Sequence, residues 1–200
     1  MAVVDKPSAR EAKRLQTRER LMGAAIAEFK RSGIAEADVG AIVAAAGVAH
    51  GTFFFHFPTK QHVLLELERR EEERIAKDLS RYIADSKRDI ASILKEVVRL
   101  VAGLERRLGA VLFKDLLALD SSQSRPIDQS KEHPVIVMVA QEIENASQRG
   151  EVDSDVNPMN SAVFFLLGLY AVLTATHNWP AQGAMLDDYM IRTLRGIEPR

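Results

Sequence analysis

The chain has 200 residues, 46% of them hydrophobic, with 27 basic and 28 acidic side chains and no cysteine. This length and apolar content suffice for one core or two small ones, which predicts a compact protein of one or two domains and not a disordered chain. The lack of cysteine, and the charges along residues 1–14 where a signal peptide needs an apolar stretch, favour a cytoplasmic protein over a secreted or disulfide-bonded one.

Charge is distributed unevenly along the chain. Residues 1–60 carry nine basic and six acidic side chains, whereas residues 61–200 carry 18 and 22. A basic segment at one end of a more acidic chain suits the binding of phosphate groups. We therefore expect a phosphate-binding domain at residues 1–60 and a second domain at residues 61–200.

Apolar residues recur at helical spacing along nearly the whole chain, and no segment alternates apolar and polar residues for long enough to form a strand. The sequence thus predicts an all-α fold. The first helix is expected to begin at Ser8, where Ser8 and Glu11 form a capping box, and to end at Gly33. Its predicted buried stripe consists of Leu15, Met22, Ala25, Ile26 and Phe29.

Two short helices and a turn follow. Asp38 can cap a helix whose apolar residues repeat at helical spacing up to Gly47. A glycine there suits a tight turn with a positive φ, and a third helix from Ala49 to residue 55 completes a helix-turn-helix. Pro58 ends this segment, and Thr59 can cap a long fourth helix.

The rest of the chain predicts five more helices, at about 89–107, 109–120, 131–149, 158–178 and 184–196. The helix at 158–178 is apolar all round, so it must be covered on both sides. Its longest uncharged apolar run, residues 162–173, is short of the roughly 20 residues that span a bilayer, and no membrane contact is expected. One predicted side holds Phe164, Leu167, Gly168, Ala171 and Ala175, and the other holds Ala162, Phe165, Leu166, Leu169 and Leu173.

Residues 48–60 read VAHGTFFFHFPTK. This segment resembles the motif of the TetR (tetracycline-repressor) family, which has the general form V-S-x-G-T-x-Y-x-H-F-x-[ST]-K. The resemblance extends upstream to residue 17 and covers about the first third of the chain. It implies a ligand-responsive DNA-binding transcriptional regulator, a repressor that a small apolar or amphipathic effector releases from a palindromic operator on double-stranded DNA. Residues 1–60 would then form the helix-turn-helix DNA-binding domain, and residues 61–200 a helical domain for ligand binding and dimerisation.

The family pattern also implies a set of DNA contacts. Gly51 and Thr52 are small enough for the third helix to approach the major groove, and Thr52 can bond a phosphate or touch a thymine methyl. Lys60 offers a charge to the DNA backbone, and Phe53 and Phe57 are expected in the core of the domain. The complete set of predicted DNA-binding residues is Thr17, Arg18, Ala49, His50, Gly51, Thr52, Phe54, His56 and Lys60.

Four residues depart from the family pattern, and each departure removes a polar contact; one of them is Gly40, which stands where a longer polar residue is frequent. Ala49 stands in place of the usual Ser, which costs a helix cap of about 1 kcal/mol. Phe54 stands in place of the usual Tyr and lacks its hydroxyl, and His50 stands where Arg or Lys is frequent. These departures predict weaker DNA binding, or binding that depends on DNA shape and on the protonation of His50.

For the second domain the resemblance implies a homodimer and a cavity for the effector. The helices at 158–178 and 184–196 can pair with those of a symmetry mate in a four-helix interface. Either His133 or His177 can serve as the polar anchor of the effector. The predicted ligand-binding residues are Phe113, Leu116, Leu117, Met138, Phe165, Tyr170 and His177.

Two other classes of protein remain as alternatives. The sequence has no Cys nucleophile, no Gly-x-Ser-x-Gly, no glycine-rich phosphate loop and no His-Glu-x-x-His, so no enzyme activity, cofactor, catalytic residue or metal site is predicted. The glutamates at 66–73 alternate with arginines and are interpreted as a solvated helix face. The other alternative is a helical dimer that binds a small molecule or a protein, with little sequence-specific DNA binding.

Overall fold

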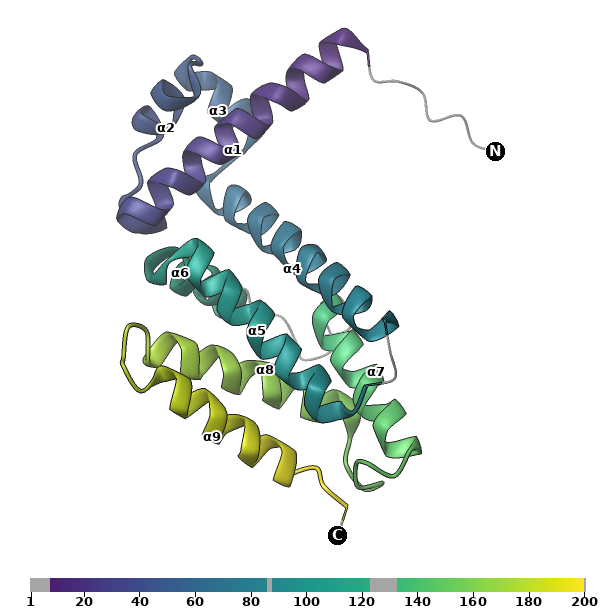
Figure 1. Ribbon diagram of the computed structural model, residues 1–200. Helices are drawn as coiled ribbons and strands as arrows, with labels where there is room; N and C mark the ends of the chain where they lie inside the picture. The colour runs from purple at the N-terminus through teal and green to yellow at the C-terminus, as the bar shows by residue number, and fades with distance from the viewer. Residues whose placement is uncertain (1–7, 86–87, 123–132, 200) are drawn as a thin grey trace. The chain divides into compact units, whose positions relative to one another are not determined.

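The computed structural model describes residues 8–85, 88–122 and 133–199, and within them the chain forms α-helices and no strand. The prediction of an all-α fold is therefore confirmed. The chain divides into two compact units, residues 1–66 and residues 67–200, which we call the head and the body. Figure 1 labels their helices.

The head contains α1 (Ala9–Glu36), α2 (Val39–Ala46), α3 (His50–His56) and the start of α4 (Lys60–Ala84). Two of the predicted caps are present: the Ser8 hydroxyl accepts a bond from the amide of residue 11, and the Asp38 carboxylate accepts bonds from the amides of residues 40 and 41. Gly47 ends α2 with a φ of 63°, in the left-handed region that glycine adopts without a steric penalty. The axis of α1 kinks at Gly33, the predicted end of the helix, and three further residues follow before α1 ends.

The core of the head is built from one face of α1 and the apolar sides of α2 and α3. Met22, Ala25 and Phe29 are buried as predicted, but Leu15 is 46% exposed and Ile26 is half-buried. The prediction for Leu15 was wrong because α2 and α3 have only eight and seven residues and cannot cover all of α1. Figure 1 shows the start of α1 extending beyond them.

The body contains α4 from residue 67 onward and five further helices: α5 (Ile90–Leu108), α6 (Ala110–Ser122), α7 (Pro134–Gln148), α8 (Pro158–Ala175) and α9 (Gln182–Arg195). These match the five predicted segments, although residues 131 and 132 of one prediction lie outside the described residues. The helix predicted to reach residue 178 ends at residue 175, where the Thr176 hydroxyl donates to the carbonyl of Val172 at 2.7 Å.

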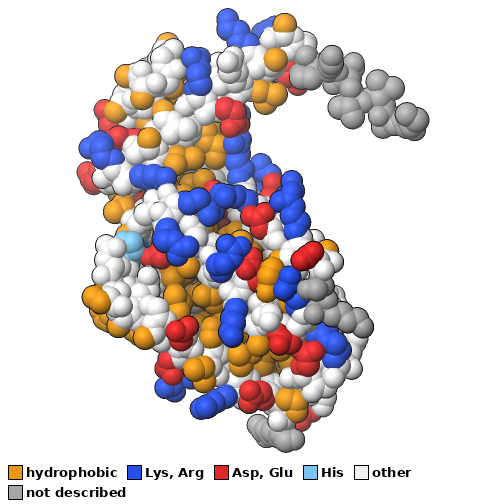
Figure 2. Space-filling model, viewed as in Figure 1, with side chains coloured by type: hydrophobic (Ala, Val, Ile, Leu, Met, Phe, Trp, Pro, Cys, Tyr) orange, Lys and Arg blue, Asp and Glu red, His pale blue; other side chains and the backbone are white. Residues whose placement is uncertain are grey.

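The two predicted sides of α8 differ in burial. Ala162, Phe165, Leu166, Leu169 and Leu173 are buried, whereas Phe164 and Leu167 are 70% and 60% exposed. By length and composition alone, α8 is apolar enough to cross a membrane, but one such helix is equally typical of a protein core. Figure 2 shows hydrophobic side chains interspersed with charged ones on the visible face of the body.

Gly168 marks a close approach between α8 and α9. A Cβ atom added at this residue would lie 2.7 Å from the Cε2 atom and from the hydroxyl oxygen of Tyr189. The Tyr189 hydroxyl donates a hydrogen bond to the carbonyl of Phe165, and the two rings are stacked with their centroids 6.0 Å apart. The absence of a side chain at residue 168 therefore lets the tyrosine ring lie directly against the backbone of α8.

Candidate functional site

The first candidate site is the outer surface of α3 in the head. Its buried side holds Phe53, and Phe57 follows the last residue of the helix; both are fully buried, as predicted. The other side exposes His50, Gly51 and Phe54, and Thr52 is half-buried. The α2 and α3 axes are bent by 95°, within the range of about 90–120° typical of a helix-turn-helix.

Phe55 also belongs to this outer surface and was missed in the sequence. It is 73% exposed, and its neighbour Phe54 is 48% exposed. The signal was present, because residues 53 and 57 are four apart on one helix side, which turns residues 54 and 55 away from the core. The exposed side of α3 therefore carries two phenylalanine rings, neither of which can donate a hydrogen bond to a phosphate.

Ala49 is the N-cap residue of α3, and its side chain makes no capping hydrogen bond. It is exposed, and its carbonyl oxygen accepts a bond from the amide of Thr52 at 2.9 Å. The geometry thus leaves room for a capping hydroxyl that the sequence does not supply.

Arg18, one of the predicted DNA contacts, is engaged inside the head. Its guanidinium donates to the carbonyl of His56 and to the carboxylate of Glu66, and it lies 4.0 Å from the centre of the Phe57 ring. The arginine side chain is 29% exposed and that of Glu66 is 13% exposed. Arg18 therefore links α1 to the end of α3 and to the first turns of α4, and Thr17 beside it is half-buried.

Lys60 is also held by the protein. Its ammonium donates to the carbonyls of Ala35 and Ala37, at 2.9 and 3.0 Å. An ammonium has three N–H groups, so two of them are directed at the end of α1 and the loop that follows it. Thr59 is exposed, and its hydroxyl lies 2.9 Å from the Nδ1 of His62.

His56 is half-buried at the end of α3. Burial, with smaller contributions from the positive charges of Arg18 and Arg14, holds the pKa of its imidazole below the ordinary value of 6.5. The side chain is consequently neutral at pH 7 and offers a hydrogen bond without a charge.

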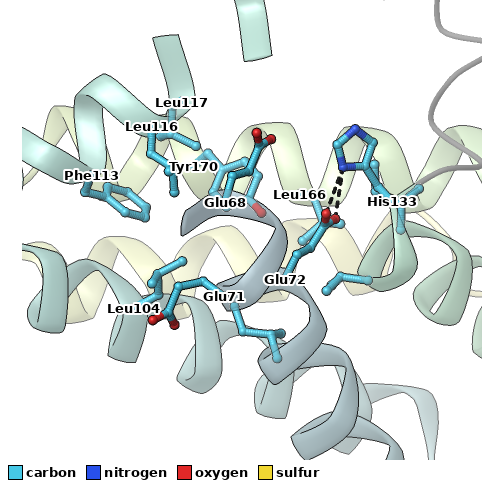
Figure 3. A pocket seen from close by; sticks show the side chains of 13 residues that line it. Glu68, Glu71, Glu72, Leu104, Phe113, Leu116, Leu117, His133, Leu166 and Tyr170 are labelled. Carbon is cyan, nitrogen blue, oxygen red and sulfur yellow. Dashed lines mark hydrogen bonds and ion pairs between the residues drawn. The ribbon is translucent and has the colours of Figure 1, made fainter. Parts of the chain in front are cut away.

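The second candidate site is a cavity of about 70 Å³ in the body (Figure 3). Four of the residues predicted to bind a ligand line it, namely Phe113, Leu116, Leu117 and Tyr170, and so does His133, one of the two histidines considered as an anchor. Leu104, Val135, Ile136 and Leu166 extend the apolar wall, and Ile75 adds a residue of α4.

The three other predicted ligand-binding residues lie elsewhere. Phe165 is buried under the Tyr189 ring and Met138 is half-buried on α7. The Nδ1 of His177 lies 2.6 Å from the carboxylate of Glu105, which is only 3% exposed. His177, which follows the end of α8, is therefore the partner of a buried acid on α5.

Three glutamates of α4 also line the cavity, namely Glu68, Glu71 and Glu72. The interpretation of this segment as a solvated helix face was wrong for them, since all three are half-buried. Their spacing carried the signal: residues 68, 71, 72 and 75 follow the i, i+3, i+4, i+7 pattern of one helix side, and the last of them is an isoleucine.

Neighbouring side chains hold two of these carboxylates in place. Glu72 lies 3.0 Å from the Nδ1 of His133, as Figure 3 shows, and the Glu71 carboxylate accepts a bond from Arg107 at 2.7 Å. Arg74 also approaches Glu71, at 3.6 Å. Within the described parts of the chain, no group of three or more His, Cys, Asp or Glu residues is arranged to hold a metal ion.

Similarity to characterised proteins begins in the head. Residues 21–67 match the family model described as bacterial regulatory proteins, tetR family. The chain is also 29% identical over 83 residues to the HTH-type transcriptional regulator AcrR of Shigella flexneri. That alignment covers 42% of this chain and 39% of the relative, so the similarity in sequence spans well under half of each protein.

Solved structures resemble the whole chain. FadR of Bacillus subtilis, in complex with stearoyl-CoA, matches 90% of this chain and 99% of its own with a TM-score of 0.72 and 17% identity. FadR of Thermus thermophilus, described as a TetR family transcriptional repressor in complex with lauroyl-CoA, matches 89% and 91% with a TM-score of 0.64 and 22% identity. At these identities the likeness shows a shared fold. The family match itself is confined to residues 21–67, so the comparisons show a head similar to that of the tetR family of bacterial regulatory proteins and a fold shared with solved regulators of that family.

Proposed function

We propose that this protein is a cytoplasmic transcriptional regulator, a repressor that binds a palindromic operator through its head and leaves it when the body binds a small apolar or amphipathic effector. The observation that carries the proposal is the outer surface of α3. After the 95° bend at Gly47, this short helix exposes His50, Gly51 and Phe54 on a side that is free of bulky cover. A helix inserted in the major groove requires such a side.

The contacts to the DNA backbone have to come from side chains that the head leaves exposed. Arg18 and Lys60 donate to groups within the head, so we assign most of the phosphate attraction to exposed cations at the start of α1: Arg10, Lys13 and Arg14. Thr52, Thr17 and a neutral His56 would add uncharged hydrogen bonds. On α3 itself, His50 and the rings of Phe54 and Phe55 would face the bases.

Communication between the two sites is assigned to α4. This helix runs without a break from Lys60, which bonds to the end of α1, to the glutamates that line the cavity. An effector that shifts the cavity side of α4 also shifts its first turn, and a coupling of about 1–3 kcal/mol is typical of such systems. The two FadR structures were solved in complex with acyl-CoA ligands, so proteins of this fold can bind a small molecule.

We propose that two copies of the chain associate through α8 and α9. Phe164 and Leu167 on α8 and Met185 and Ile191 on α9 are between 41% and 70% exposed, which is unusual for large apolar side chains of two neighbouring helices. A second copy related by a two-fold axis would cover this face and would place two heads on two half-sites. We assign the protein no catalytic step.

The proposal is tested by a gel-shift assay with DNA from the promoter region of the protein's own transcription unit. The matched variants are Gly51→Leu on α3 and Gly23→Leu on α1, because both glycines are exposed and helical, and a Cβ added at either would meet no neighbouring atom within 4 Å. We expect Gly51→Leu to weaken specific binding by more than tenfold and Gly23→Leu to leave it unchanged.

Equal binding by the two variants would contradict the docking of α3. Binding of no DNA by the folded wild-type protein would favour the alternative function, a dimeric module that binds a small molecule or a protein. Light scattering tests the dimer independently of DNA binding. A dimer should give about twice the chain mass of 22.2 kDa.

A further inference from the structure

The wall of the body cavity combines apolar side chains with an unusual set of charges. Its described lining residues include three carboxylates, those of Glu68, Glu71 and Glu72, and none of these lining residues is Lys or Arg. The remaining side chains of the wall are apolar or aromatic, apart from His133. These carboxylates also have partners within the protein: Arg107 and Arg74 approach Glu71 from outside the lining, and His133 lies 3.0 Å from Glu72.

We propose that the effector of this protein is a cationic amphiphile, with an ammonium or similar positive head beside the α4 glutamates and an apolar part among Phe113, Leu116 and Leu117. The inference rests on the proposed function of the cavity as the effector site, and it names the charge of the ligand. Carboxylates that are partly removed from water beside apolar groups gain most from a nearby cation and repel an anion.

The aromatic residues of the wall support the same choice. Phe113 and Tyr170 come from α6 and α8, and their ring centroids are 6.3 Å apart at an angle of 67°. Ring faces attract a positive charge within about 6 Å. In Figure 3 the Phe113 ring lies at one end of the cavity and the Glu72–His133 pair at the other, so a molecule between them meets both a ring and a carboxylate.

The size of the cavity limits how an acyl-CoA could bind. Its volume of about 70 Å³ is well below the roughly 300–1,000 Å³ of typical ligand sites, so any effector has to widen it. A long acyl chain with a thioester and a phosphate-rich head would have to widen it most, and its negative groups would have to pass or adjoin the three glutamates. A short chain with a positive head requires less opening and gains from the charges already present.

The test compares probes that share an eight-carbon chain and differ in the charge of the head: octyltrimethylammonium, octanol, octanoate and octanoyl-CoA. Calorimetry on the full-length protein at physiological salt gives the four dissociation constants. We expect octyltrimethylammonium to bind at least tenfold more tightly than octanoate or octanoyl-CoA, with octanol between them. Binding of either anion as tightly as the cation would overturn the inference.

Variants locate the preference at the glutamates. Glu68→Gln combined with Glu72→Gln should reduce the ratio of cation to anion affinity to less than threefold, and Glu68→Gln alone should give part of this loss. The matched control is Glu73→Gln on the same helix, because Glu73 does not line the cavity and forms an exposed ion pair with Arg69. A ratio that stays at the wild-type value in folded Gln variants would contradict the assignment.

The preference for a cationic ligand and the proposed DNA-binding function can be tested independently of each other. If none of the four probes binds while the protein still shifts its promoter DNA, the cavity is no amphiphile site and the inference fails, although the DNA-binding role stands. If the cation preference is observed but no DNA is bound, the inference holds and the regulatory function fails. If both hold, addition of octyltrimethylammonium should release the DNA and octanoate should not.

Discussion

The head and the body reach their structures by different routes. In the head, single residues of distinctive type decide local geometry: Asp38 caps α2, Gly47 turns the chain, and the pair Phe53 and Phe57 sets the buried side of α3. In the body, helices follow from apolar periodicity, but the chemistry of the cavity depends on which side chains of different helices meet. The comparison teaches that a site within one short motif can be predicted from sequence more fully than a site assembled from distant segments.

The largest expected effect tests the core of the head. Phe57→Ala removes a fully buried ring and should lower the free energy of unfolding of the head by about 3–5 kcal/mol. Phe55→Ala removes another phenylalanine ring, but this one is 73% exposed. It should therefore change the free energy of unfolding by less than about 0.5 kcal/mol. Chemical denaturation followed by circular dichroism measures both. Similar losses of stability in the two variants would contradict the structure, in which only the first of these two phenylalanines is buried.

The corresponding test in the body concerns the buried acid of α5. His177→Ala removes a partner of the Glu105 carboxylate and should cost about 1–3 kcal/mol, because a buried charge loses a hydrogen bond. His62→Ala, at an exposed residue of α4, is the control. Thermal unfolding of the two variants gives the comparison. An unchanged melting temperature for His177→Ala would show that the pair contributes nothing to stability.

Lys60 separates a structural role from a role in DNA binding. If its ammonium chiefly holds the end of α1, Lys60→Ala should destabilise the head by about 1 kcal/mol. If it chiefly contacts phosphate, stability should be unchanged and the salt dependence of DNA binding should fall by about one unit of slope per head. The structure favours the first outcome. Unfolding and salt titration on the same preparation decide between them.

Ala49→Ser supplies the hydroxyl that the start of α3 lacks. The expected gain in stability is about 0.5–1 kcal/mol, since the N-cap residue already has an extended backbone and its side chain makes no capping bond. Ala45→Ser, at an exposed residue in the interior of α2, should give no gain. A stabilisation of equal size at both residues would exclude capping as its cause.

The smallest expected effect is the response of the head to acid. The pKa of His56 is lowered on folding, so its contribution to stability is complete above the unfolded value of about 6.5 and is lost as the pH falls through the folded value. His56→Gln should therefore remove part of the loss of stability between pH 7 and pH 5. Melting curves at several pH values measure this, and a wild-type slope in the variant would contradict it.

Sequence reasoning predicted the helices in both units, since capping residues and apolar periodicity are local properties. It also placed Phe113, Leu116, Leu117 and Tyr170 around one cavity. It did not reveal that Arg18 bonds to Glu66 or that Lys60 bonds to Ala35, because each contact joins residues more than 20 positions apart. A basic side chain in a DNA-binding motif looks the same in sequence whether its charge is directed at phosphate or at the protein.

The same limit explains the glutamates of α4. Charged residues interleaved with arginines are typical of a solvated face, and Glu73 with Arg69 is such a pair. Glu68 and Glu72 belong to the other side of the helix, where α6, α7 and α8 supply the opposite wall. The two sides of α4 differ only in whether other helices pack against them, and the sequence of α4 does not contain that information.

The contact between Gly168 and Tyr189 has a consequence for the history of the chain. Because the tyrosine ring occupies the space that any side chain at residue 168 would need, selection acts on the two positions as a unit. A mutation from glycine is tolerated only after residue 189 has become smaller, and a chain that loses the tyrosine first is left with a gap against α8. In related chains with this contact, we therefore expect the two positions to covary, with glycine retained wherever tyrosine is present.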